Sequence, residues 1–125
     1  MFKRNKRAAM GNGSDWPTYA YKGSKLRRHK RERAKKGYST FDWWSFDTYI
    51  TWVIGNAALD FKHGFGYIYG DNDKDHEEFI DSIAKPLLEY SEKKFDVFGD
   101  EEVELYENAQ AAMHKFADYL GHFWD

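Results

Sequence analysis

The residues best suited to ligand chemistry lie in one stretch that runs from basic side chains into aromatic ones. Guanidinium groups bind anions, aromatic rings stack on bases, and a carboxylate accepts hydrogen bonds. The sequence therefore predicts a pocket for an anionic, ring-bearing ligand such as a nucleotide. Its expected members are Arg27, Arg28, Arg31, Tyr38, Trp43, Trp44 and Asp47.

Within this set, Asp47 is the residue whose role depends most on whether its side chain is buried and paired. Helical spacing places it on the flank of an apolar stripe, where a carboxylate is either buried and paired, in contact with a ligand, or exposed. A buried carboxylate needs donors, because an unpaired buried charge is costly. An Arg or Lys of the preceding basic segment or an indole N–H would supply them, and we favour a paired, structural Asp47.

Patterns typical of other chemistries are weak. The histidines lack metal-ligand spacing, so we expect no metal and no cofactor, and the pair Asp60 and His63 is the nearest approach to a ligand set. The chain has no cysteine and no Gly-x-Ser-x-Gly elbow to hold a nucleophile. A hydrolase using Asp47, Asp60 and His63 is an alternative, but a protein without catalytic residues is the leading expectation.

Charge is divided sharply along the chain. Residues 1–36 contain thirteen Lys/Arg and two acids, a net charge of +11, whereas residues 37–125 contain six Lys/Arg and nineteen acids, a net charge of -13. The basic part can bind nucleic acid, dock on the acidic body of its own or a neighbouring subunit, or remain solvated. The nucleic-acid alternative uses the segment 22–36, with contacts expected from Lys25, Arg27, Arg28, Lys30, Arg31, Arg33, Lys35 and Lys36.

Length and composition limit the class of protein. A chain of 125 residues suggests one domain, and the absence of cysteine excludes a disulfide framework. No apolar run reaches the roughly 18 residues that a membrane-spanning helix needs. The basic start is not followed by an apolar segment, so we expect no secretory signal.

The patterning predicts an all-α protein: a basic helix over residues 24–36 with Ser24 as N-cap, followed by three amphipathic helices. A capping box of Ser39 and Asp42 opens a helix over 39–63, Asp73 or Asp75 caps a helix over 75–95, and a third helix covers 100–124. Residues 1–23 are expected to form a basic and aromatic arm, and 24–125 a single helical bundle domain. The buried stripe of the helix over 39–63 is expected to contain Trp43, Phe46, Ile50, Val53, Ile54, Ala57 and Phe61.

One run of residues suggests a family. The stretch Gly37–Ile50, GYSTFDWWSFDTYI, resembles a group of small bacteriophage proteins with the core G-[WFY]-S-x-x-D-x-W-x-x-D-x-[YH]-[LI], and the chain end around Trp124 is also similar. The resemblance covers residues 27–125. It implies a helical, phage-encoded protein acting in the host cytoplasm, and it supplies no catalytic residues.

The leading hypothesis is thus a non-enzymatic phage accessory protein that acts by binding in the infected cell. It would sequester an anionic, nucleotide-like ligand or inhibit a host defence protein, and the division of charge favours a homo-oligomer. Nucleic-acid binding by the basic segment is the alternative.

Overall fold

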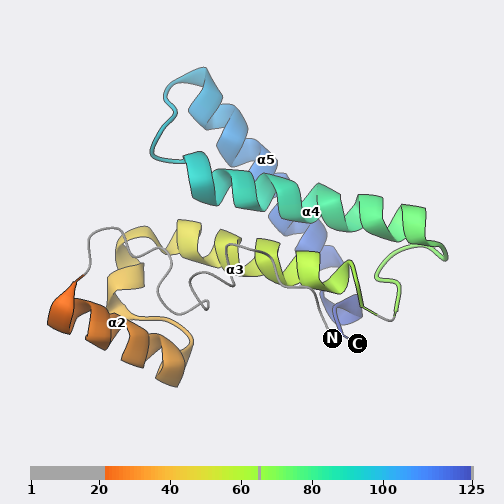
Figure 1. Ribbon diagram of the computed structural model, residues 1–125. Helices are drawn as coiled ribbons and strands as arrows, with labels where there is room; N and C mark the ends of the chain where they lie inside the picture. The colour runs from red at the N-terminus through yellow and green to blue at the C-terminus, as the bar shows by residue number, and fades with distance from the viewer. Residues whose placement is uncertain (1–21, 65, 125) are drawn as a thin grey trace.

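The protein is all-α throughout the part of the chain that the computed structural model describes, residues 22–64 and 66–124 (Figure 1). This confirms the predicted fold class. The predicted arm, residues 1–23, lies outside the described residues except for its last two. The elements in chain order are α2 (Gly23–Lys36), η1 (Thr40–Ser45), α3 (Phe46–Phe61), α4 (Asp73–Lys93), α5 (Asp100–Asp118) and η2 (Leu120–His122).

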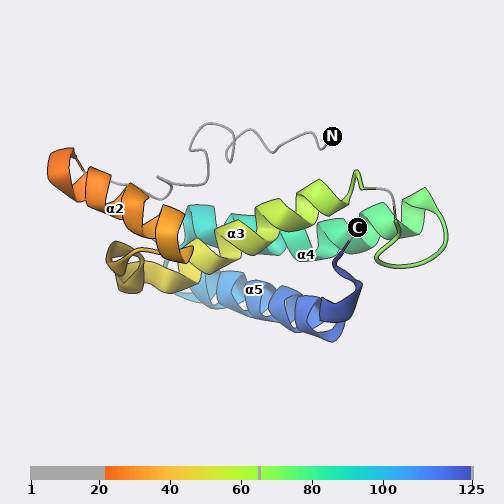
Figure 2. The same ribbon diagram turned by 90° about the horizontal axis from the view of Figure 1, so that it is seen from below.

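Helix α4 is the central element of the core. Both α3 and α5 pack mainly on α4 rather than on each other, and α2 lies apart at the end where α3 begins (Figures 1 and 2). Ile80, Ile83, Ala84 and Leu87 are fully buried. Their i, i+3, i+4, i+7 spacing forms one apolar face of α4, so the periodicity of the sequence identifies this part of the core directly.

The N-terminal part of the predicted helix over 39–63 has a different structure. Its capping box is present, and the Ser39 N–H donates to Asp42 Oδ2 at 2.8 Å, but residues 40–45 form a 3₁₀ turn. Ser45 has a non-helical backbone (φ -147°, ψ 62°). The α-helix therefore begins only at Phe46, and the side-chain periodicity changes at this break.

The predicted buried face of that helix is also wrong: Ala57 is exposed, and Ile50, Val53, Ile54 and Phe61 are only partly buried. Trp43 and Phe46 are exposed, whereas Thr48, Thr51, Gly55 and Ala58 are buried. Small residues spaced three and four apart allow two helix backbones to approach closely, which large side chains would prevent.

Gly55 marks the close approach of α3 to α4. A Cβ atom at this position would lie 2.8 Å from Leu88 Cγ and 3.4 Å from the Ala84 carbonyl oxygen. A larger residue at this position would force the two helices apart or displace Leu88.

The N-cap of helix α4 is a residue other than the two that were predicted. Asn72 is the N-cap, and its side-chain oxygen accepts a hydrogen bond from the Asp75 N–H at 2.9 Å, so neither Asp73 nor Asp75 is the cap. The helix continues through Pro86 to Lys93. Within the described residues, no helix has the length and apolarity required to span a bilayer.

Candidate functional site

Helix α2 is attached to the rest of the molecule by polar side chains. Arg33 Nε lies 2.9 Å from Asp42 Oδ2 and Arg33 Nη2 lies 2.5 Å from Asp42 Oδ1, which is a bidentate ion pair. Both side chains are only 2% exposed. The guanidinium carbon also lies 4.0 Å from the centre of the Tyr49 ring. A buried pair with this geometry fixes α2 firmly relative to η1.

Two further contacts complete this attachment. His29 Nδ1 lies 2.5 Å from Ser39 Oγ, and His29 is fully buried. Glu32 accepts hydrogen bonds from the Thr40 N–H and hydroxyl at 2.7 and 2.8 Å. We refer to His29, Glu32 and Arg33 of α2, with Ser39, Thr40 and Asp42, as the α2 anchor.

The anchor shifts the pKa values of its two carboxylates downward. Burial alone would raise the pKa of Asp42, but the hydrogen bonds from Arg33 and from the Ser39 N–H outweigh burial and lower it. The backbone hydrogen bond from Thr40, followed by that from Arg28, lowers the pKa of Glu32 to about 2. Both groups are therefore ionised at neutral pH, as the anchor requires.

The side of α2 opposite the anchor is cationic. Arg27, Arg31 and Lys35 are exposed and spaced four residues apart, so they form one row about 180° around the helix from His29 and Arg33. We refer to these three residues as the cationic face. Arg28 and Lys30 flank the row, whereas Lys25 and Lys36 lie nearer the anchored side of α2, and Lys22 precedes the helix; all five are exposed.

Aromatic rings lie next to these cations. Lys25 Nζ and Arg28 Cζ lie 6.0 and 5.5 Å from the centre of the Phe41 ring, and Lys36 Nζ lies 5.4 Å from that of Tyr38. These distances are typical of cation–π contacts. The segment after α2 thus combines positive charge with accessible aromatic surface.

Two tryptophans of η1 add to that surface. The Trp43 side chain is 67% exposed and Trp44 is 75% exposed. Trp44 stacks on Phe95, with ring centres 5.6 Å apart and planes inclined by 19°. Both residues were predicted site members, and both are accessible to a ligand.

Asp47 belongs to a different site, between α3 and α4. It accepts hydrogen bonds from the Tyr90 hydroxyl at 2.5 Å, from Lys94 Nζ, and from the Ser45 hydroxyl at 3.2 Å. Asp47 is thus paired, but its donors come from α4 rather than from the basic segment or an indole. Burial raises its pKa, while Lys94 and Tyr90 outweigh burial and lower it.

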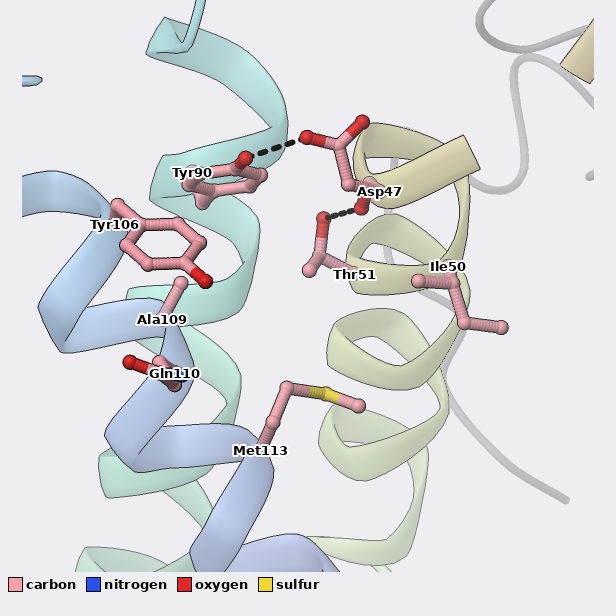
Figure 3. Close-up of a pocket in the computed structure, with 8 residues that line it drawn as sticks. All are labelled: Asp47, Ile50, Thr51, Tyr90, Tyr106, Ala109, Gln110 and Met113. Carbon is pink, nitrogen blue, oxygen red and sulfur yellow. Dashed lines mark hydrogen bonds between the residues drawn. The ribbon is translucent and has the colours of Figure 1, made fainter. Parts of the chain in front are cut away.

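A cavity of about 200 Å³ adjoins Asp47. It lies where α3 and α5 diverge over α4, with Asp47 beside Tyr90 at one end and Met113 toward the other (Figure 3). The lining is mostly apolar and consists of Asp47, Ile50, Thr51, Tyr90, Tyr106, Ala109, Gln110 and Met113. Its shape and chemistry suit a small apolar group rather than an anion.

The predicted anionic-ligand pocket is therefore divided. Asp47 lines the cavity, whereas the other six predicted members do not: Arg27, Arg28, Arg31, Tyr38, Trp43 and Trp44. Those six lie on α2 and the segment that follows it. Among the predicted nucleic-acid contacts, Arg33 differs from the rest because its buried guanidinium is occupied by Asp42. We exclude it from the candidate interface.

The alternative hydrolase site does not form. Asp47 and Asp60 lie at opposite ends of α3, and thirteen residues of α-helix separate them by about 20 Å. Within residues 22–64 and 66–124, no three His, Asp or Glu side chains are grouped closely enough to hold a metal ion. No signal in the sequence pointed to Tyr90 and Lys94 as partners of Asp47, because they are more than forty residues away along the chain.

Comparison with known proteins shows no match to a protein-family model, a curated protein or a solved structure.

Proposed function

We propose that this protein is a non-enzymatic binding protein that holds the phosphates of a nucleic acid on the cationic face of α2. The observation that carries the proposal is the division of α2 into an anchored side and a cationic side. Three amphipathic helices, in this proposal, form the bundle that supports the basic helix. Lys and Arg side chains on one face of a helix are typical of phosphate recognition.

The charge of α2 supports this function over internal neutralisation. Among the residues that the structure describes, Arg33 of α2 forms an ion pair with Asp42 of η1. The pair Arg28–Glu32 is internal to the helix and spans 2.6 Å. Arg27, Arg31 and Lys35 are exposed to solvent, although the body of the protein is rich in acids.

Salt-dependent binding tests the proposal. Binding of a fluorescently labelled single-stranded oligonucleotide is measured by anisotropy at several salt concentrations. The logarithm of the association constant should fall linearly with that of the salt concentration, because binding releases counterions. Replacing Arg27, Arg31 and Lys35 by Gln should reduce the slope by about 2, at about 0.7 per lost phosphate contact on a single strand.

A matched variant controls for net charge. Lys74, Lys85 and Lys93 are exposed cations of α4. Their replacement by Gln removes the same charge from another helix and should leave the slope close to that of the wild-type protein. Equal losses in the two variants, or no binding by the wild-type protein, would refute the proposed function.

Sequestration of a small nucleotide is the second candidate. It is supported by aromatic rings beside other cations of α2, since Arg28 lies over the Phe41 ring and Lys36 over the Tyr38 ring. Competition distinguishes the two functions. A mononucleotide should displace the oligonucleotide at similar concentrations if the site takes one nucleotide, and only at much higher concentrations if several phosphates are bound.

The wider biological setting is also part of the proposal. The resemblance of residues 37–50 to small bacteriophage proteins supports a phage-encoded protein that acts in the host cytoplasm, where it would bind a nucleic acid or inhibit a host defence protein.

Unlike charges on α2 and on the start of α5 support association of two copies. Asp100, Glu101 and Glu102 are exposed at that start. Native mass spectrometry of the full chain tests this association.

A further inference from the structure

The cavity beside Asp47 is separate from the cationic face of α2. Its eight lining residues all belong to α3, α4 and α5, and its volume is about 200 Å³. An engineered apolar cavity of about 150 Å³ in another protein binds benzene. A second copy of this chain would instead need an interface of about 800 Å² on each partner. The cavity is therefore of the size that takes one small ring rather than a helix of another protein.

The walls of the cavity favour an aromatic ligand. The Met113 side chain extends from α5 toward α3 (Figure 3), and Ile50 contributes aliphatic surface from α3. Ala109 is buried and contributes only a methyl group to the wall. The rings of Tyr90 and Tyr106 lie at the Asp47 end, with centres 6.3 Å apart and planes inclined by 55°. A further ring gains from edge-to-face or offset contacts with such rings, beyond the burial of its apolar surface.

One polar group of this lining, the Tyr106 hydroxyl, is available to a ligand. It points from α5 toward the space between α5 and α3 (Figure 3). Among residues 22–64 and 66–124, no group forms a hydrogen bond with it, whereas the Tyr90 hydroxyl donates to Asp47. A phenolic hydroxyl can donate and accept a hydrogen bond. Tyr106 can therefore hold a polar substituent of a molecule whose ring lies in the cavity.

Charge at the cavity favours a neutral ligand. Burial raises the pKa of Asp47, but hydrogen bonds from Lys94 and Tyr90 outweigh burial and lower it, so the carboxylate is ionised. Lys94 forms an ion pair with this carboxylate, and the two charges compensate each other. An ionic ligand would lose hydration here without gaining a free counter-charge.

We infer that the cavity between α3, α4 and α5 binds a small neutral aromatic molecule with one hydrogen-bonding group, such as a phenol. The ring packs against Ile50, Ala109 and Met113, and the polar group forms a hydrogen bond with the Tyr106 hydroxyl. This site shares no residue with the cationic face. It adds a second binding activity to the protein and does not depend on the first.

Three probe molecules test the site on the full chain by NMR. Phenol carries a ring and a hydroxyl, benzene carries the ring alone, and benzoate carries a ring and a negative charge. The methyl signals of Ile50 and Met113 should shift and saturate with phenol. Benzene should bind about fivefold more weakly, because it lacks one net hydrogen bond. Benzoate should produce no saturable shift of either signal.

Tyr106→Phe isolates the contribution of the hydroxyl. The substitution keeps the ring and removes an exposed polar group, so far-UV circular dichroism should match that of wild type. Phenol should then bind about as weakly as benzene, while the affinity for benzene should stay unchanged. Tyr69→Phe is the matched control, because Tyr69 is similarly exposed and lies outside the cavity lining. This control should retain the preference for phenol.

Three outcomes would overturn the inference. Shifts that rise linearly with phenol concentration and never saturate would mean that the cavity holds no ligand. Saturable shifts confined to residues outside the lining would place the ligand elsewhere. An unchanged preference for phenol in Tyr106→Phe, or an equal loss in Tyr69→Phe, would exclude the hydrogen bond to Tyr106. Because these probes contain no nucleic acid, none of the results bears on phosphate binding by α2.

Discussion

Replacement of Asp42 by Asn should detach α2 from the rest of the protein. The substitution keeps the size of the side chain but removes its charge, so the buried guanidinium of Arg33 loses the counter-charge of its bidentate pair. Both side chains are 2% exposed, so water does not compensate. Removing one partner of a buried ion pair typically costs about 3–5 kcal/mol.

The structure indicates that this substitution destabilises the attachment of α2 rather than the core. The remaining contacts of the α2 anchor are His29 with Ser39 and Glu32 with Thr40. Such hydrogen bonds contribute about 0.5–1.5 kcal/mol each, or about 1.5–3 kcal/mol where one partner is charged. These three hydrogen bonds together are comparable in size with the expected loss, but they must also offset the entropy of ordering α2, which contributes no residue to the hydrophobic core cluster. The core should therefore remain folded while α2 is released.

Helix α2 should unfold once it is released. Its 14 residues are near the lower limit for an isolated helix, and its dense like charges disfavour a helix further. Far-UV circular dichroism should lose about a fifth of the helical signal, the share of α2 in the four α-helices. Amide hydrogen exchange should show loss of protection confined to residues 23–36.

Asp81→Asn is the matched control for this experiment. Asp81 pairs with Lys62 at 2.9 Å, but both side chains are 24% exposed, and such pairs contribute about 0–1 kcal/mol. This variant should keep full helicity and protection in α2. If Asp42→Asn retains protected amides in residues 23–36 to the same extent as Asp81→Asn, the buried ion pair is not what holds α2, and the reasoning is refuted.

Three other perturbations follow from the structure. Gly55→Val should lower the free energy of unfolding by about 1–3 kcal/mol in urea denaturation, because a side chain there meets α4, while Gly121→Val, at a position with no neighbour within 4 Å, should have little effect. Tyr90→Phe should cost about 1.5 kcal/mol through loss of the hydrogen bond to Asp47, and a change below about 0.5 kcal/mol would contradict this role. Glu32 has a pKa lowered from 4.5 to about 2, so its contribution is fully present above pH 4.5 and is lost as the pH falls toward 2. An NMR titration of its carboxyl group together with amide exchange in α2 would show this, and an unshifted Glu32 pKa would exclude it.

The local features of the fold could be predicted from the sequence. The apolar repeat of Ile80, Ile83, Ala84 and Leu87 identified a buried helix face, and all four residues are fully buried. The capping box of Ser39 and Asp42 was also predicted and is present. These features depend on residues within one or two helical turns of each other, where spacing alone decides geometry.

The features that depend on distant residues could not be predicted. Thr51 and Gly55 are buried because α4 lies close to them, whereas Trp43 and Phe46 are exposed although their hydrophobicity favours burial. The partners of Asp47 lie on another helix and share no local pattern with it. Which side chains are buried, and which ones meet, depends on how the helices pack. The distance between two helices cannot be predicted from a hydropathy pattern.

The charge arrangement of α2 has a consequence for how a polyanion would approach. The acids of residues 37–125 repel phosphates, so binding is favoured only from the side of α2 that the anchor leaves exposed. At physiological salt, charges are screened beyond about 8 Å, and acids on the far helices therefore do not cancel the attraction at the cationic face. A net charge of -2 thus does not oppose nucleic-acid binding. It instead reflects two regions of opposite charge, one of which would attract a polyanion while the other would restrict its orientation.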